Sequence, residues 1–276
     1  QTLLFSATVP RAIAKLAESY QREAVRVETV SGASQHADIE YRAMAVSARD
    51  GENAIINVLR YFEAPNAIVF CNTRAMVNRL TTRLSNRGFP VGALSGELTQ
   101  SERTHALQAM RDGRARVCVA TDVAARGIDL PNLDLVVHAE LPSSHETLLH
   151  RSGRTGRAGR KGVSALIVPP AARKKAERIL HFAKLKAEWG EAPSAEEVTA
   201  ADEARMVENP AWLEEIPGSD IGAVNMLVGR FAPEQIAAAY LRLYHAHHTP
   251  PEELSAVDAK PADRKSTRLN SSHRCI

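Results

Sequence analysis

The chain has 276 residues, a formal net charge of +3 and 44% hydrophobic residues, a composition that predicts a folded soluble protein with a buried core. It contains no run of 18 apolar residues and no charged-then-apolar leader, so we expect a cytoplasmic protein without a membrane span or membrane partner. The cysteines lie far apart, and Cys71 and Cys118 fall in apolar strand-like runs. This favours small buried side chains over a disulfide or a metal site.

From residue 39 to residue 168, short apolar β-branched runs alternate with segments of helical periodicity. This alternation predicts an α/β fold, in which helices cover both faces of a parallel sheet and ligands bind at the carboxyl ends of the strands. The expected strands are residues 39–46, 67–71, 90–94, 116–120, 134–138 and 163–168, and the expected helices are residues 52–62, 74–87, 100–111 and 145–151.

Three further segments follow the predicted sheet. Residues 171–189 have the pattern of a basic helix, residues 190–217 that of an acidic, alanine-rich linker, and residues 218–250 that of a small helical element. In this element Asp220 can cap one helix and Pro233 can open another. Their apolar stripes favour a local hairpin core, with a homodimer surface as the alternative.

Charge is distributed unevenly along the chain. Residues 151–186 contain eleven Lys or Arg and a single acid, whereas residues 187–259 contain three basic and fourteen acidic residues. The basic block predicts a contact surface for a polyanion, and a solvated charged face is the alternative.

The two ends carry separate expectations. The chain begins inside an apolar run without an initiator Met, so we expect a fragment, with residues 1–30 as the end of a preceding domain and a linker to a main domain at residues 31–189. Residues 251–276 are expected to form a disordered tail. Within it, residues 263–276 resemble the translation of a sequencing adapter and are left out of the fold.

The most informative stretch combines Ala-Thr-Asp-Val-Ala-Ala-Arg-Gly-Ile-Asp at residues 120–129 with His-Arg-Ser-Gly-Arg-Thr-Gly-Arg at residues 150–157. The first motif brings Thr121, Asp122 and Asp129 to a strand end. The second carries arginines on a glycine-punctuated loop, where planar guanidinium groups can bind phosphate through paired hydrogen bonds. The two motifs together predict phosphate chemistry.

Together with Ser6-Ala-Thr8, Ile68-Val-Phe-Cys-Asn-Thr-Arg74 and the pair Gln100 and Arg103, these motifs resemble the C-terminal RecA-like domain of DEAD-box RNA helicases. The resemblance covers about residues 1 to 186, in the order of the family. It implies an ATP-dependent RNA helicase that separates short duplexes locally, similar to bacterial members with roles in cold adaptation or ribosome assembly.

The resemblance also implies roles for individual residues. Arg154 and Arg157 would be the arginine fingers that stabilise charge on the γ-phosphate of ATP, and Asp129 and Gly127 would contact the nucleotide. The residues implied in coupling two RecA-like domains are Ser6, Thr8 and His150.

An RNA-binding set is implied as well. Its contacts would be to phosphate and sugar, so we expect single strands and short duplexes to bind with little base preference. For Gln100 and Arg103 a local helix-cap bond is the alternative. The set is Arg74, Gly96, Gln100, Arg103, Thr121 and Gly127.

Two motifs needed for ATP hydrolysis are not in the sequence: the Gly-x-x-x-x-Gly-Lys-Ser/Thr phosphate loop and the Asp-Glu-Ala-Asp run. Ligands for the β-phosphate and Mg²⁺ are therefore expected on another domain, and this chain alone is expected not to hydrolyse ATP. The alternatives to an RNA helicase are a non-catalytic RNA-binding scaffold and a DNA helicase of the same superfamily.

Overall fold

A computed structural model describes residues 11–20, 37–96, 98–126, 133–156, 159–247 and 249–257. The chain divides into two units, residues 1–34 and residues 35–276. In the first unit the described part is helix α1 (Arg11–Tyr20), whereas the strand predicted at the start of the chain, with Ser6 and Thr8, lies outside the described residues. None of the helices in the described ranges is long and apolar enough to cross a membrane.

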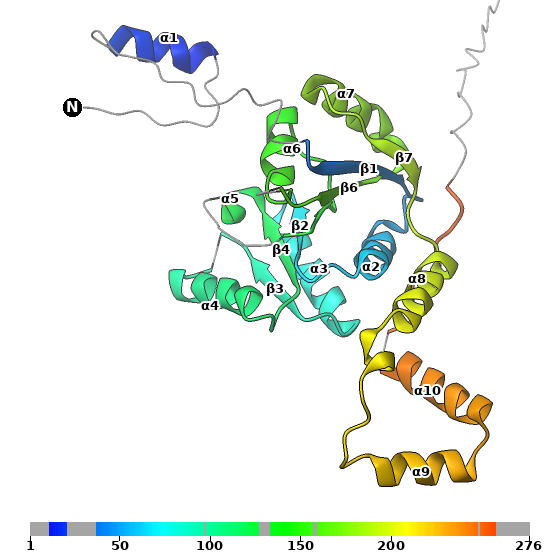
Figure 1. Cartoon of the computed structure of the whole chain (residues 1–276). Coiled ribbons are helices and arrows are strands. Elements are labelled where there is room, and N and C mark those ends of the chain that lie inside the picture. The colour runs from blue at the N-terminus through cyan, green and yellow to red at the C-terminus, as the bar shows by residue number, and fades with distance from the viewer. Residues whose placement is uncertain are drawn as a thin grey trace, which may run out of the picture. The chain divides into compact units, whose positions relative to one another are not determined.

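The larger unit is built on a sheet whose strand pairs are all parallel among the described residues (Figure 1). Its seven strands lie in the order β3-β4-β2-β5-β6-β1-β7. The predicted α/β fold is therefore confirmed. The strands are β1 (Ile39–Ala45), β2 (Ala67–Cys71), β3 (Val91–Leu94), β4 (Val117–Thr121), β5 (Leu135–His138), β6 (Gly162–Val168) and β7 (Glu188–Glu191).

Helices cover both faces of the sheet. Successive side chains of a strand point to opposite faces, and in the buried strands both sets are apolar and must be covered. In β2, Val69 and Cys71 belong to the core under α2 and α3, whereas Ile68 and Phe70 belong to the core on the other face, with residues of α4 and α5. The helices are α2 (Gly51–Phe62), α3 (Arg74–Asn86), α4 (Gln100–Arg111), α5 (Asp122–Ala125), α6 (His145–Ser152) and α7 (Arg173–Ala183).

Local sequence explains where several of these helices begin. The Thr73 hydroxyl accepts a hydrogen bond from the Met76 backbone N–H at the start of α3, and the Ser144 hydroxyl accepts one from Thr147 at the start of α6. Such caps contribute about 1 kcal/mol each. They place the first turns of these helices next to the carboxyl ends of the strands.

The expected single helix at residues 171–189 is wrong in its second half. Helix α7 ends at Ala183 because Lys184 adopts a left-handed backbone conformation with φ of 56°. The chain then forms β7, which pairs with β1 at the edge of the sheet, and the Trp189 ring lies under the Arg173 guanidinium at 4.7 Å. Edge pairing and this ring contact outweigh the helical pattern.

The expected linker at residues 190–217 contains helix α8 (Ala195–Val207). A reciprocal capping box of Ser194 and Glu197 starts it, and Val198 is fully buried. Its Asp202 forms a 2.7 Å ion pair with Arg60 of α2, and both side chains are nearly buried. Helix α8 is thus part of the folded unit.

A short 3₁₀ turn, η2 (Pro210–Leu213), leads to α9 (Ile221–Arg230) and α10 (Pro233–His247). Pro233 opens α10 as expected, but the Asp220 side chain makes no capping hydrogen bond. The expected hairpin core is wrong for α9, which has no buried residue.

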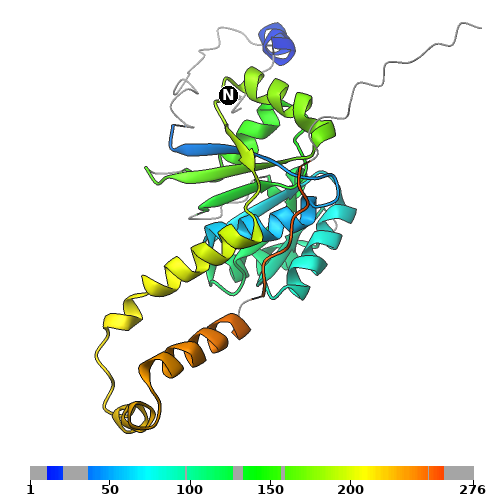
Figure 2. The same ribbon diagram turned by 90° about the vertical axis from the view of Figure 1, so that its right-hand side faces the viewer.

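Residues 249–257 return to the sheet domain and pack on it. Figure 2 shows this segment, in orange to red, running along α2 and α3. The backbone N–H of Glu252 donates to the Asn57 side chain, and the backbone N–H of Ser255 donates to the Asp50 carboxylate. Residues 251–257, expected to belong to a disordered tail, thus lie on the folded domain.

The buried pair of Arg60 and Asp202 gives a stability prediction. Asp202→Ala leaves the Arg60 charge buried without its partner, so we expect the free energy of unfolding to fall by about 3 kcal/mol in urea titrations. The neighbouring acid Glu203 is exposed, and Glu203→Ala should change stability by less than about 0.5 kcal/mol. Equal losses in the two variants would contradict a stabilising role of the pair.

Candidate functional site

Three polar residues follow the carboxyl ends of adjacent strands in the centre of the sheet. Asn72 follows β2, Asp122 follows β4 and Glu140 lies just beyond β5. The order β4-β2-β5 makes these three strand ends neighbours. Ligands of parallel sheets bind at this edge, so the residues here set the geometry of the candidate site.

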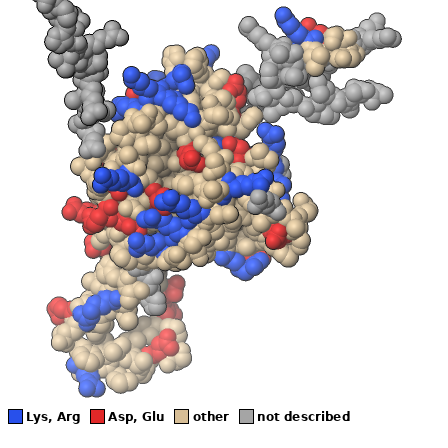
Figure 3. Space-filling view, turned by 180° about the vertical axis from the view of Figure 1, so that it is seen from behind, with Lys and Arg blue, Asp and Glu red and all other residues tan. Residues whose placement is uncertain are grey.

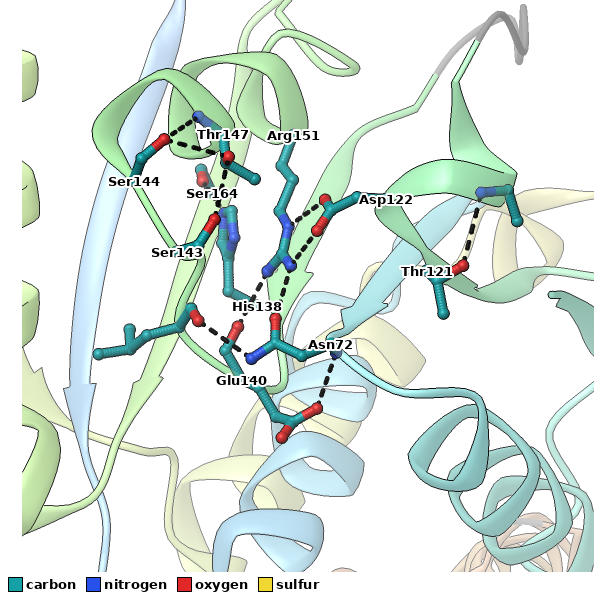
Figure 4. A network of polar contacts seen from close by, with 12 residues as sticks. Asn72, Thr121, Asp122, His138, Glu140, Ser143, Ser144, Thr147, Arg151 and Ser164 are labelled. Atoms are coloured by element: carbon teal, nitrogen blue, oxygen red, sulfur yellow. Dashed lines mark hydrogen bonds and ion pairs between the residues drawn. The ribbon is translucent and has the colours of Figure 1, made fainter. Parts of the chain in front are cut away.

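Arg151 of α6 connects all three strand ends (Figure 4). Its Nε donates to Asp122 Oδ1 at 2.6 Å and its Nη2 donates to Asp122 Oδ2 at 2.7 Å, so the two side chains form a bidentate ion pair. Further bonds run from Nη1 to the Glu140 carbonyl at 2.9 Å and from Nη2 to Asn72 Oδ1 at 2.9 Å. The Asn72 backbone N–H in turn donates to Glu140 Oε2.

The Arg151 side chain is only 1% exposed, whereas that of Asp122 is 38% exposed. A buried guanidinium is stable only where its hydrogen bonds are satisfied, and loss of a partner from such a pair costs about 3 to 5 kcal/mol. The Phe70 ring lies 5.2 Å from the guanidinium carbon and adds a cation–π contact. Arg151 therefore fixes the last turn of α6 on the strand ends.

A neutral polar cluster lies beneath this charge. His138 Nε2 lies 3.0 Å from the Ser164 hydroxyl, which lies 2.9 Å from the Ser152 hydroxyl. Burial, and secondarily the Arg151 charge, lower the pKa of His138 well below its usual value. Tyr41, which forms a hydrogen bond with Ser152, belongs to the same cluster, and burial raises its pKa to about 12. His138, Tyr41 and the two serines are therefore uncharged at neutral pH.

The loop after α6 is anchored directly after Arg154. Buried Thr155 donates its hydroxyl hydrogen to the Leu133 carbonyl, and Gly156 adopts φ of 64° against Ile39. A Cβ at Gly162 would lie 1.9 Å from the Thr155 hydroxyl, so the close approach requires glycine there. The half-buried Arg154 thus extends from an anchored backbone, while Arg157 lies outside the described residues.

Of the other predicted site residues, the structure describes Thr121, predicted to bind RNA, and His150, predicted to couple two domains. Thr121 is nearly buried at the end of β4, where its hydroxyl accepts a hydrogen bond from the Ala124 N–H and starts α5. His150 is exposed in the last turn of α6. Gly127 and Asp129 lie outside the described residues.

Arg74 and Gly96 lie together, as a shared ligand site would need. The Arg74 Nη2 is 3.6 Å from the point where a Gly96 Cβ would be, an ordinary contact distance, so the two residues are direct neighbours. Gln100 is exposed in the first turn of α4. The capping alternative for Gln100 and Arg103 is wrong, because Thr99 and Glu102 form the capping box of α4.

Arg103 acts on the loop after β4 instead. Its Nη2 donates to the Ala124 carbonyl at 2.7 Å and to the Arg126 carbonyl at 2.9 Å. These bonds hold the backbone at the end of α5, up to Arg126.

The basic block at residues 151–186 is not one surface. Figure 3 shows Lys and Arg side chains gathered over α7, where Lys174 and Arg178 are exposed. Arg173 is paired with Glu177 on the same helix, and Arg151 is among the most buried side chains of the protein. Only part of the block can serve as a polyanion footprint.

Sequence reasoning missed the organising role of Arg151. It treated this residue as the end of a helix and Asp122 as a neighbour of Asp129. The available signal was the position of Asn72, Asp122 and Glu140 directly after three apolar strands, which predicts a polar cluster at one edge of the sheet. In the part of the chain that is described, no cluster of three His, Cys, Asp or Glu residues could hold a metal ion.

Comparisons with known proteins show which family the chain resembles. Residues 51–159 match the family "Helicase conserved C-terminal domain". The chain is 36% identical over 197 residues to the ATP-dependent RNA helicase DbpA of Bacillus subtilis, covering 71% of this chain and 41% of the relative. The chain thus spans about two fifths of the length of that relative.

Two solved structures are similar as well. The E. coli DEAD-box protein SrmB, bound to regulator of ribonuclease activity A, is 33% identical with a TM-score of 0.53, and the match covers 55% of this chain and 90% of that chain. Saccharomyces cerevisiae Dbp5, bound to RNA and ADP BeF3, is 26% identical with a TM-score of 0.61, covering 72% of this chain and 54% of the other.

The buried His138 makes stability depend on pH. Below the usual His pKa of about 6.5 the unfolded chain binds a proton that the folded chain does not, so stability falls as the pH falls. Between pH 7 and 5.5 we expect this group to cost about 1.3 kcal/mol in free energy of unfolding, measured by urea titration. His138→Asn should remove that increment, whereas His105→Asn, at an exposed position on α4, should retain it. An unchanged pH dependence in His138→Asn would contradict the assignment.

Proposed function

Because the chain belongs to the DEAD-box family of RNA helicases, we propose that it works as the C-terminal RecA-like half of an ATP-dependent RNA helicase that unwinds short duplexes locally. The observation that supports this most directly is the anchored loop after α6, which presents Arg154 beside strand ends joined by Arg151. The proposal includes a second RecA-like domain that carries the phosphate loop and the ligands of Mg²⁺.

In this proposal Arg154 and Arg157 bind the γ-phosphate of ATP when the two domains close. Guanidinium groups there stabilise the charge of the phosphoryl-transfer transition state, an effect of about 10³ to 10⁵ in rate. Asp129 and Gly127 contact the nucleotide. Ser6, Thr8 and His150 couple domain closure to RNA binding.

RNA would bind at the same edge of the sheet. The proposed contacts are to phosphate and sugar, which gives little base preference and a strong salt dependence. The proximity of Arg74 to Gly96 supports a shared phosphate contact, and the bonds of Arg103 to the loop after β4 support a positioning role beside Gln100, Thr121 and Gly127.

The catalytic proposal predicts that RNA-stimulated ATPase activity, measured with the chain joined to its first RecA-like domain, falls about 10³-fold in Arg154→Ala or Arg157→Ala. Arg160→Ala is the matched control, because Arg160 follows the same loop but lies 55% exposed near Asp134. The chain alone should show only background ATPase activity. Activity that survives both arginine replacements would contradict the arginine-finger assignment.

The RNA proposal predicts that Arg74→Ala weakens binding of a single-stranded RNA about tenfold, the loss of roughly 1.5 kcal/mol for one hydrogen bond between charged groups. The slope of log K against log salt should fall by about 0.7, measured by fluorescence anisotropy. Arg79→Ala is the control: Arg79 is on the same helix and pairs with Glu52. Equal effects of the two replacements would show a diffuse charge effect, which contradicts a specific contact.

We also propose that residues 218–250 form a homodimer surface. On α9 the neighbouring residues Leu227 and Val228 are 46% and 64% exposed, and on α10 Leu243 is 63% exposed. Exposed apolar side chains gathered on one hairpin are stabilised when another surface covers them. A second copy of the same hairpin supplies a matching apolar surface.

Light scattering after size exclusion should therefore give twice the mass of the chain, and Val228→Glu should give the mass of one chain. Asn225→Glu adds the same charge at an exposed polar position of α9 and should leave the dimer intact. A monomeric unaltered chain at micromolar concentration would exclude this surface as a stable dimer interface.

A further inference from the structure

Residues 249–257, here called the strap, cross the face of the domain opposite α4. The Thr249 hydroxyl donates to the Arg87 carbonyl at the end of α3 at 2.6 Å, and the Ser255 N–H donates to Asp50 Oδ2 at the start of α2 at 2.8 Å. The strap therefore runs antiparallel to α2, along the side where α3 also lies (Figure 2).

Asn57, which is fully buried in α2, binds the strap backbone as a neighbouring strand would. Its Oδ1 accepts from the Glu252 N–H at 2.8 Å and its Nδ2 donates to the Glu252 carbonyl at 2.8 Å. The second Nδ2 hydrogen reaches the Pro193 carbonyl at 2.9 Å. One side chain thus holds the backbone at the entry to α8 and at the return of the chain after α10.

Side chains of the strap add selectivity to these backbone bonds. The Glu252 carboxylate forms a 2.5 Å ion pair with Arg87, and Leu254 packs on the core cluster under α2 and α3. Pro250 and Pro251 restrict the backbone to extended conformations, which lowers the entropy cost of docking. Backbone pairing combined with side-chain pockets is a general mode of peptide recognition.

The Asp50 side chain indicates that the domain is adapted to the strap. Asp50 occupies the N-cap position of α2 but makes no capping hydrogen bond there. It is 7% exposed, and its carboxylate accepts the Ser255 N–H instead. The nearly buried Asp50 carboxylate thus accepts a hydrogen bond from the strap and does not cap its own helix.

We propose that the surface formed by α2 and the end of α3 is a peptide-recognition site for an extended segment with a Pro-Pro-acid-x-Leu sequence, and that its occupant is the strap of the same chain. Occupancy closes a loop: α8 to α10 leave the domain beside Asn57 and return to it. The helices α8 to α10 thus form an arm that is attached to the domain at both ends. The strap holds the end of this arm that follows α10, independently of ATP and RNA.

A matched pair of variants of the full chain tests this attachment by hydrogen exchange. Glu252→Ala combined with Leu254→Ala should raise the exchange rates of the Glu252 and Ser255 amides at least tenfold, while the amides of β4 keep their protection. Glu253→Ala, at the exposed neighbouring acid, should leave all of these rates unchanged. Asn57→Ala should release the same amides from the helix side.

A labelled synthetic peptide of residues 249–257 tests recognition. An attached segment acts at an effective concentration on the order of millimolar, so the unaltered chain should bind the added peptide at least tenfold more weakly than the Glu252→Ala, Leu254→Ala chain does. Adding Asn57→Ala to that chain should abolish binding, with thermal melting confirming that each variant is folded.

Three results would overturn the proposal. The first is strap amides that exchange at unstructured rates in the unaltered chain, and the second is a folded strap-deficient chain that does not bind the peptide. The third is strap protection that rises with protein concentration, because it would assign the strap to a second copy. None of these readouts involves ATP or RNA, so failure here leaves the helicase proposal standing, and the reverse also holds.

Discussion

The positive charge of Arg151, buried at the carboxyl edge of the sheet, is the constraint on which the candidate site depends. A desolvated guanidinium requires acceptors on all sides, and here they come from Asp122, the Glu140 carbonyl and Asn72. These groups follow three different strands. Their relative positions are therefore fixed together with the last turn of α6, and the loop that carries Arg154 inherits this rigidity. A phosphate-binding group is useful in catalysis only if it is held in place before its ligand arrives.

The polar groups beneath Arg151 are neutral for the same reason. A second buried charge near the guanidinium would need its own partners, and His138 instead stays uncharged, bonded to Ser164, with its pKa lowered by burial and by Arg151. The edge of the sheet is thus layered: a single paired charge faces the site, and a neutral hydrogen-bonded cluster separates it from the apolar core. At low pH the His138 side chain binds a proton in the unfolded chain but not in the folded chain, and the free energy of unfolding falls.

The sequence predicted the six strands β1 to β6 within about one residue, because strands buried on both faces, as most of these are, are continuous apolar runs with few alternatives. It failed for β7 and α8, which lie in an acidic part of the chain. Strand β7 is a short edge strand stabilised by pairing with β1, and α8 is stabilised by the distant partner Arg60. It also counted Arg151 as part of a surface block. Composition does not distinguish a buried arginine from an exposed one when its acceptors lie 29 and 79 residues away along the chain.

The same physical limit applies to Asn57, whose partners lie 136 and 195 residues further along the chain, at Pro193 and Glu252. An asparagine in the middle of an amphipathic helix has no local signature of this role, since its acceptors and donor are backbone groups that any sequence provides. Arg151 and Asn57 therefore have similar roles on opposite faces of the sheet. Each is a buried polar side chain that forms hydrogen bonds to chain segments outside the strands, and these bonds fix the positions of those segments. On one face this fixes the loop proposed to bind phosphate, and on the other it fixes the return of the α8 to α10 arm. Because the acceptor sets share no residue, loosening the strap should leave the geometry around Arg151 intact.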